Sequence, residues 1–145
     1  MLSTIFIIIG VIATISVLLK FFIPPQDDSS KSAIQKNQEL TQDKFDYFSH
    51  QGKIAYQKKQ FEQAIKLFDS AYQAKPQNVI LIQKAGCYRE LKDFEKCMQI
   101  CNAVIDEDQS FADAYLMRST CNLGLNNKRQ AIEDLRKFIE IEPSK

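Results

Sequence analysis

From Phe45 onward the sequence aligns with itself three times, first at an offset of 33 residues and then at 34. A fixed period of this length predicts stacked units that each bury one face against a neighbour, rather than a single mixed core. The surface of such a stack is suited to holding other molecules, so the period favours a binding function over catalysis. The residues in register are Phe48, Leu81 and Tyr115; Ala64, Cys97 and Ala131; and Phe68, Cys101 and Leu135.

Each unit is predicted to contain two α-helices. In the second half of the first unit, apolar residues recur at helical spacing from Ala64 to Ala71. Pro76 and Pro143 follow such segments, where a proline ends a helix, and Asn126-Asn127 suits a turn between helices. Small residues are expected to let the two helices of a unit approach closely; they are Gly52, Ala85 and Ser119 in the first helices and Ala64, Cys97 and Ala131 in the second.

These residues resemble the tetratricopeptide repeat (TPR), a helix–turn–helix unit whose pattern reads W-x2-L-G-x2-Y, then A-x3-F, then P. The resemblance implies an all-α fold, a three-repeat TPR helical solenoid with units at residues 45–77, 78–111 and 112–145. The chain departs from the family pattern where a leucine usually precedes the small residue of the first helix. Those positions hold Gln51, Lys84 and Arg118.

The N-terminus predicts a membrane anchor. Leu2 to Leu19 contains no charged residue, and the apolar run continues over Lys20 to Ile23. At 1.5 Å per residue, these runs of 18 and 22 residues span roughly 27 to 33 Å, about the thickness of a bilayer's hydrocarbon core, so residues 1–23 are predicted to form a transmembrane helix. A cleaved signal peptide is the alternative. The segment lacks a basic first region and ends in bulky residues where a cleavage site has small ones, which favours a retained transmembrane helix.

The flanking charges predict the orientation of this anchor. Lys20, Lys31 and Lys36 follow the apolar run, so the positive-inside rule places the repeats on the cytoplasmic or matrix side of a single-pass membrane protein. Four cysteines, expected as reduced thiols, fit such a compartment. A mitochondrial membrane is one candidate, although no presequence is evident, because no arginine precedes Arg89. Residues 24–44 are predicted to be a linker, partly helical.

Composition and motifs argue against several other functions. The chain has 19 basic and 18 acidic residues and no basic stripe, so nucleic acid is not an expected partner. His50 is the only histidine, so a Ser-His or Cys-His arrangement would have to rest on a residue at the start of a repeat helix; it is read as a solvent-exposed structural histidine. Cys97 and Cys101, four residues apart, could share a metal ion, but they occupy small packing positions and are read, like Cys87 and Cys121, as buried apolar thiols. No enzyme activity, metal, cofactor or small-molecule substrate is therefore expected.

The resemblance also implies where a partner binds, because the first helices of successive repeats line a concave groove in this family. Lys53 and Arg89 are expected to hold a backbone carbonyl or a carboxylate. The apolar residues between them suit an amphipathic helix or an extended peptide, and an empty, solvated face is the alternative. The residues expected to line the groove are Ser49, Lys53, Tyr56, Ile82, Gly86, Arg89, Leu116, Thr120 and Leu123.

Chaperone-tail receptors of the same family hold a C-terminal carboxylate with Lys and Asn in the first repeat, Asn in the second, and Lys and Arg in the third. Only one of the matching residues here is basic, and Asp113 would repel a carboxylate. A chaperone tail is therefore not the expected ligand. The matching residues are Ser49, Lys53, Gln83, Asp113 and Met117.

A second surface is predicted at the last helix, expected over about residues 129–142. Leu135, Phe138 and Ile139 are expected to stay partly bare there, so that a partner or a second copy covers them. Two functions fit these surfaces. The first is a membrane-anchored scaffold for protein–protein interaction, an accessory subunit of a larger membrane complex. The second is a receptor or co-chaperone that captures peptides or precursor proteins at an organelle surface, with an enzyme as an outsider.

Overall fold

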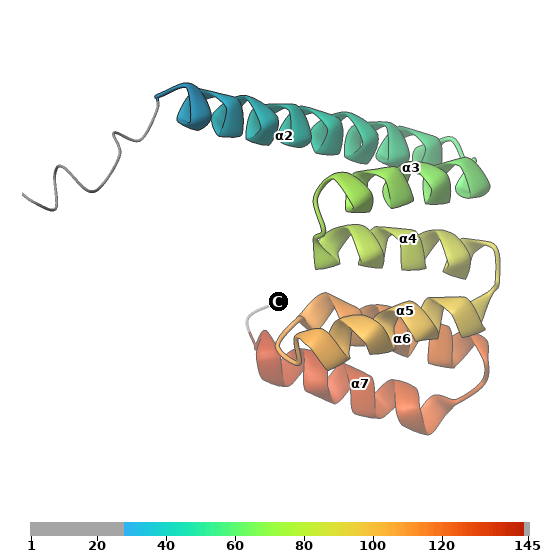
Figure 1. Ribbon diagram of the computed structural model, residues 1–145. Helices are drawn as coiled ribbons and strands as arrows, with labels where there is room; N and C mark the ends of the chain where they lie inside the picture. The colour runs from blue at the N-terminus through green and yellow to red at the C-terminus, as the bar shows by residue number, and fades with distance from the viewer. Residues whose placement is uncertain (1–27, 144–145) are drawn as a thin grey trace, which may run out of the picture. The chain divides into compact units, whose positions relative to one another are not determined.

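The computed structural model describes residues 28–143, and within that range all of its regular secondary structure is α-helical. From residue 39 onward the helices follow one another in a stack, each beside the next and running in the opposite direction (Figure 1). The prediction of an all-α helical solenoid is confirmed for these residues. The helices are α2 (Asp28–Gln57), α3 (Phe61–Ala74), α4 (Asn78–Glu90), α5 (Phe94–Glu107), α6 (Ala112–Gly124) and α7 (Lys128–Ile141).

The chain divides into two units after residue 38. In the first unit, residues 28–38 form the beginning of α2, where the Ser32 hydroxyl donates a hydrogen bond to the Ser29 carbonyl over 3.0 Å. The predicted anchor at Leu2–Leu19 lies outside the residues that the structure describes. Between residues 28 and 143, none of the helices combines the length and the apolarity that crossing a membrane requires.

The small residues allow the helices of each unit to pack closely, as the sequence predicts. Ala64, Cys97 and Ala131 are fully buried. At Gly52 the fit is closest, since a Cβ atom there would lie 2.6 Å from Cε1 of the buried Phe68 ring. Glycine is the residue that lets α2 cross α3 at this point without displacing the ring.

Two apolar clusters form the core, and α4 belongs to both. Ile80 and Cys87 pack into the cluster shared with α2 and α3, which surrounds Phe68. Ile82 and Ala85, on the other side of α4, pack into the cluster shared with α5 and α6. The second helix pair is therefore not an independent unit, because its first helix closes the core of the repeat before it.

Two of the three positions that depart from the TPR pattern, Lys84 and Arg118, carry cations that tie neighbouring repeats together. The Lys84 ammonium lies 2.6 Å from the Asp69 carboxylate, and the Arg118 guanidinium donates to the Asn102 amide oxygen over 2.7 Å. These are the same contact one repeat apart, because both residues shift by a repeat length. In each case a cation of the first helix holds the second helix of the preceding unit, where the family pattern packs a leucine.

Arg118 makes a further contact that has no counterpart in the second repeat. Its guanidinium binds both oxygens of Asp134 on α7, at distances between 2.6 and 3.1 Å, and the Asn122 amide donates to the same carboxylate. Asp134 is only 5% exposed. The hydrogen bonds with Asp134 raise the pKa of Arg118, despite the opposing effect of burial. The network of Arg118, Asn122 and Asp134 fills the space between α6 and α7.

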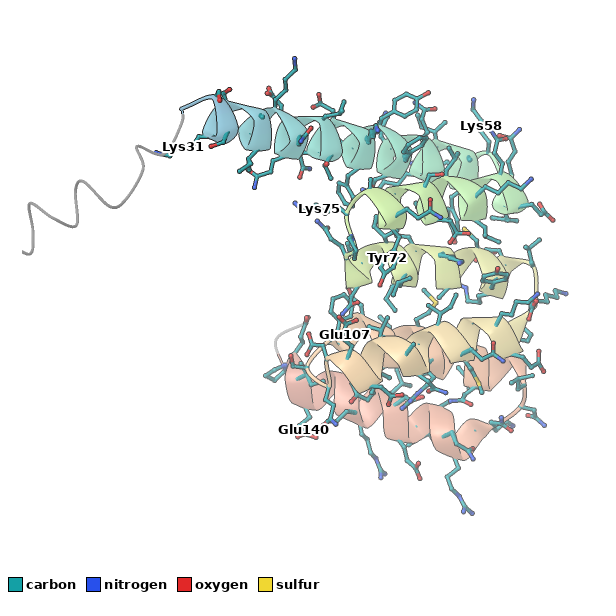
Figure 2. The ribbon with its side chains drawn as sticks, viewed as in Figure 1. Lys31, Lys58, Tyr72, Lys75, Glu107 and Glu140 are labelled. Carbon is teal, nitrogen blue, oxygen red and sulfur yellow. A yellow bond between two sulfur atoms is a disulfide. The ribbon has the colours of Figure 1, made fainter. Side chains whose placement is uncertain are left out.

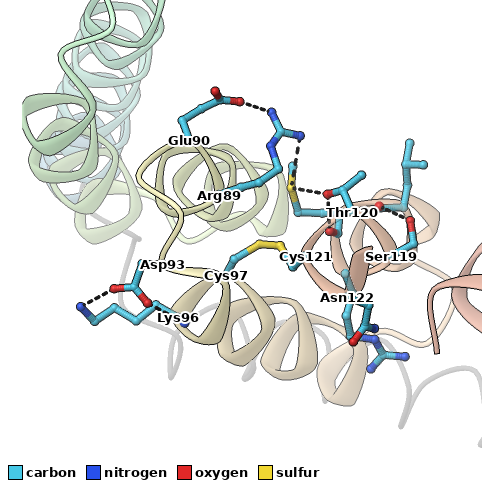
Figure 3. Close-up of a disulfide and its surroundings, with 12 residues drawn as sticks. Arg89, Glu90, Asp93, Lys96, Cys97, Ser119, Thr120, Cys121 and Asn122 are labelled. Carbon is cyan, nitrogen blue, oxygen red and sulfur yellow. Dashed lines mark hydrogen bonds and ion pairs between the residues drawn. A yellow bond between two sulfur atoms is a disulfide. The ribbon is translucent and has the colours of Figure 1, made fainter. Parts of the chain in front are cut away.

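A disulfide joins the second repeat to the third. Cys97 on α5 and Cys121 on α6 are bonded, with their Cα atoms 6.5 Å apart (Figure 3). The expectation that all four cysteines are reduced is wrong for this pair, although both do occupy small buried positions. By the chain-entropy relation, a loop closed over 24 residues stabilises the folded state by about 3 kcal/mol.

The other two cysteines remain free thiols inside the core. Burial raises the pKa of the Cys87 thiol to about 11 and that of the Cys101 thiol to about 12. Both thiols are therefore protonated near neutral pH, and a protonated buried thiol is a poor nucleophile and metal ligand. They act as small apolar residues, as predicted from the sequence.

The turn within each repeat uses a residue in the left-handed region. Lys59, Lys92 and Asn126 have φ angles of 61°, 61° and 63° and fall at matching positions of the three units. The predicted turn at Asn126-Asn127 is confirmed, and asparagine adopts this conformation more readily than lysine does. The helices of each pair thus reverse direction over three residues.

The last helix exposes less than the sequence suggests. Ile139 is 59% exposed, and Ile132, one heptad earlier, is 51% exposed. Leu135 is half-buried, and Phe138 packs against the cluster shared with α5 and α6. Phe138 is partly exposed, and its packed side fills the space between α7 and the preceding helices. The apolar strip on α7 is therefore formed by Ile132 and Ile139.

Candidate partner-binding groove

A central hollow of about 360 Å³ opens between α2, α4 and α6. Four of the predicted groove residues lie in its wall, and most of its surface is apolar. The volume is sufficient for one or two side chains of a bound segment. The lining residues are Lys53, Tyr56, Gln57, Phe68, Ile82, Gln83, Gly86 and Met117.

A second hollow, of about 650 Å³, lies between α2 and α4. Lys53 and Gln83 line both spaces, so the two hollows are neighbours along one groove. His50, an exposed residue as predicted, lies in the wall of the second hollow with Asp46. The groove therefore changes from an apolar centre to a more polar end, as a surface that binds an amphipathic segment does.

Gly86 forms the floor of the central hollow. A Cβ atom at this position would lie 3.6 Å from Cε of Met117 and 3.9 Å from Cε2 of Tyr56, which are ordinary contact distances. Unlike Gly52, Gly86 is not needed to let two helices pack closely. Its effect is to leave the hollow open, at a cost in helix propensity of about 1 kcal/mol relative to alanine.

Arg89, predicted to anchor a carboxylate, is already engaged within the chain. Its guanidinium pairs with Glu90 over 2.5 Å (Figure 3). It also donates to the Tyr56 hydroxyl over 3.3 Å. Burial acts to lower the pKa of Arg89, but the hydrogen bond and charge of Glu90 outweigh it and raise that pKa. Burial and the nearby Glu90 charge also raise the pKa of Tyr56. Arg89 thus shapes the groove wall rather than presenting a free cation.

Two polar groups of the groove have no partner within the described residues. Lys53 is exposed and makes no hydrogen bond or ion pair there. The Gln83 side-chain oxygen is buried and accepts no hydrogen bond, alone among buried side-chain polar atoms of residues 28–143. A buried acceptor without a donor costs about 1–3 kcal/mol, so a ligand that donates a hydrogen bond to it gains that energy back.

The remaining predicted residues fall in different places. Ser49 lines the second hollow but is only 7% exposed, and Ile82, in the wall of the central hollow, is only 8% exposed. Thr120 bonds back to the Met117 carbonyl over 2.7 Å. Leu116 and Leu123 are 38% and 54% exposed on α6 but line neither hollow. The structure therefore brings together only the α2 and α4 members of the predicted set.

Two residues of the groove wall, Met117 and Gln83, are absent from the set predicted to line the groove. The sequence identifies them only as positions where chaperone-tail receptors of the same family carry polar clamp residues. Met117 instead contributes an apolar side chain to the central hollow, with its sulfur 3.9 Å from the Arg89 guanidinium. Gln83 is three residues from Gly86 on α4, and this helical spacing was the available sign that it faces the same groove.

Comparison with known proteins agrees with the helical-repeat fold described above. A family model described as tetratricopeptide repeat matches residues 55–121, and a second model with the same description matches residues 112–145. Among curated proteins, heat shock protein STI1 of Saccharomyces cerevisiae is 27% identical over 101 residues. That alignment covers 68% of this chain but only 17% of the yeast protein, so the chain spans less than a fifth of that relative.

Two solved structures share the arrangement of helices. The first TPR of Spaghetti (RPAP3), bound to HSP90 peptide SRMEEVD, has a TM-score of 0.65 at 23% identity, over 71% of this chain and 82% of that chain. The Arabidopsis OM64 TPR domain has a TM-score of 0.66 at 24% identity, over 75% and 88%. At these identities the likeness concerns the fold.

Proposed function

Since residues 55–145 are tetratricopeptide repeats and this chain belongs to that family, we propose that it is a membrane-anchored protein-interaction module whose groove takes a peptide segment of a protein partner. The observation that carries the proposal is the central hollow, which is apolar, open and bordered by two unsatisfied polar groups. Lys53 supplies a cation for a carboxylate or backbone carbonyl, and Gln83 supplies an acceptor for a backbone N–H.

The hollow favours an apolar side chain over a C-terminal carboxylate as the group that enters it. Met117 stands where a chaperone-tail receptor has a cation, and Asp113 is exposed at another such position. One lysine gives a carboxylate less stabilisation than several cations do, and the Asp113 charge opposes binding. The segment we propose therefore places an apolar side chain over Gly86 and runs its backbone past Gln83.

Filling the hollow should weaken this binding without unfolding the protein. Gly86→Leu places a side chain on the floor of the hollow, where a Cβ atom meets no backbone and the helix gains propensity. With a photoreactive residue at Gln57, in the wall of the hollow, a discrete crosslink to a protein partner is expected in native membranes. Gly86→Leu should reduce that crosslink about tenfold, which corresponds to about 1.4 kcal/mol of binding free energy.

Gln99 gives the matched control, because it is an exposed glutamine on α5 and lines neither hollow. The same photoreactive residue at this position should capture no common product. Peptide SRMEEVD, added in excess, should leave the Gln57 crosslink intact. A crosslink that persists in Gly86→Leu would show that the partner binds elsewhere, and one displaced by SRMEEVD would make the groove a chaperone-tail site.

The membrane part of the proposal rests on the uncharged run from Leu2 to Leu19. We expect alkaline carbonate washing to leave the full chain in the membrane pellet, and a shortened chain that begins at Gln26 to be released. Release of the full chain by carbonate would contradict a transmembrane anchor.

Stoichiometry separates an accessory subunit from a transient receptor. A subunit of a larger membrane complex should co-purify with its partner in equal amounts after mild detergent treatment. A receptor for peptides or precursor proteins should retain only a small fraction of its partner under the same conditions. We favour the subunit, because an apolar strip remains uncovered on α7 in addition to the groove.

A further inference from the structure

The outer face of α7 carries residues of the kind that pack in a core, as the equivalent positions of the preceding repeat show. One repeat earlier, Ile139 corresponds to Ile105 and Ile132 to Met98. Ile105 is only 8% exposed, and Met98 packs against the core cluster that α5 and α6 share. Ile139 is 59% exposed, because α7 ends the stack of described helices (Figure 1). The same face is covered in the second repeat and bare in the third.

Charged residues border this strip in an alternating row. Arg129, Glu133, Arg136 and Glu140 follow one another at spacings of four, three and four residues, which places them along one side of α7. All four are exposed; Glu140 is labelled on α7 in Figure 2. Glu140 pairs with Lys137 over 3.0 Å, an exposed contact of little strength. The other three form no ion pair within residues 28–143.

The charges of this row complement those of a second copy only when the two α7 helices run antiparallel. Laid parallel, two copies place like charges opposite each other. Laid antiparallel, the first arginine meets the last glutamate, and every inner charge meets its opposite. An isologous twofold contact requires this self-complementarity, since each residue meets its counterpart from the other copy.

The ends of α7 favour the same arrangement. The helix has Lys128 and Arg129 at its N-terminus with no acidic residue in its first turn, and no basic residue in its last turn. This is the reverse of what the helix dipole favours, whereas α3, α5 and α6 each have an acidic residue in the first turn. An antiparallel second helix brings its negative end to Lys128 and Arg129.

From these features we propose that a second copy of this chain covers the face, with the two α7 helices antiparallel about a twofold axis. Ile132 and Ile139 form the apolar centre of the contact, and the alternating row forms one polar edge. Arg129 pairs with Glu140 of the partner subunit, and Glu133 pairs with Arg136 of the partner subunit. The groove between α2, α4 and α6 is not part of this contact and stays open to a different protein.

Charge reversal with restoration tests the proposal in the full chain, solubilised in mild detergent with two different affinity tags. The acidic variant combines Arg129→Glu with Arg136→Glu, and the basic variant combines Glu133→Arg with Glu140→Arg. Copies of the unmodified chain should co-purify. The amount of each variant that co-purifies with a second copy of the same variant should fall at least about tenfold. The acidic and basic variants, expressed together, should recover it, which an unfolded variant could not do.

The matched control changes charge by the same amount away from the strip. Lys58→Glu with Lys66→Glu, at two exposed positions, should co-purify with itself as the unmodified chain does. The proposal is overturned if unmodified copies do not associate, as expected when a different protein covers α7. It is equally overturned if both variants associate with themselves undiminished, as they would through the N-terminal segment, or if mixing them restores nothing.

Discussion

Phe68→Ala is expected to lower the free energy of unfolding by about 3–5 kcal/mol. The ring is 1% exposed and is the largest fully buried side chain of the cluster formed by α2, α3 and α4. Its removal leaves a cavity lined by three helices that cannot all collapse into it, because Gly52 offers no side chain to fill the space. Urea unfolding followed by far-ultraviolet circular dichroism measures the effect.

Two further variants show whether this loss comes from the packing described. Tyr47→Ala removes an aromatic ring that is 61% exposed and should change stability by less than about 0.5 kcal/mol. Gly52→Ala should cost about 1–3 kcal/mol alone, because its Cβ meets the Phe68 ring, and much less in the Phe68→Ala background. Equal midpoints for Phe68→Ala and Tyr47→Ala, or strict additivity for the Gly52 pair, would contradict this packing.

Arg118→Met should destabilise the protein by about 3 kcal/mol, near the lower end of the range for a broken buried pair because the arginine is partly exposed. The substitution keeps an apolar stem but leaves the buried Asp134 carboxylate with the Asn122 amide as its remaining side-chain donor. It also removes the contact to Asn102 that holds α6 against α5. Thermal and urea unfolding measure the loss.

A double-mutant cycle separates the buried charge from lost packing. Arg118→Met combined with Asp134→Leu removes both charges and should be less destabilised than the sum of the two single variants. Lys137→Met breaks an exposed ion pair on the same helix and should cost less than about 0.5 kcal/mol. If Arg118→Met proves no worse than Lys137→Met, the Asp134 network does not stabilise the fold.

The repeat period predicted the fold because the period records packing that recurs. Gly52, Ala64 and Phe68 each have counterparts one and two units later, so their burial could be read from self-alignment. The disulfide could not be read in this way. Cys97 occupies a second-helix position and Cys121 a first-helix position, and comparison of equivalent residues says nothing about neighbours that are not equivalent.

The groove was predicted less well than the fold, for a related reason. Helical position indicated that Lys53 and Arg89 face the same side, but not which other side chains they meet. Arg89 pairs with Glu90 and donates a hydrogen bond to Tyr56. The second contact depends on the directions of two side chains that are 33 residues apart in the sequence. Lys84 and Arg118 depart from the family pattern in the sequence. Only the structure shows that they make the same contact between successive repeats.

The bond between Cys97 and Cys121 also governs how the chain responds to tension. In the proposed membrane-anchored module, tension acts between the anchor and a bound partner and can separate helices from the stack. The disulfide excludes a loop of 24 residues from extension, which at about 3.5 Å per residue withholds roughly 80 Å of length. With the bond intact, residues 97–121 add no length when the chain is extended; once it is reduced, the same segment becomes a compliant tether.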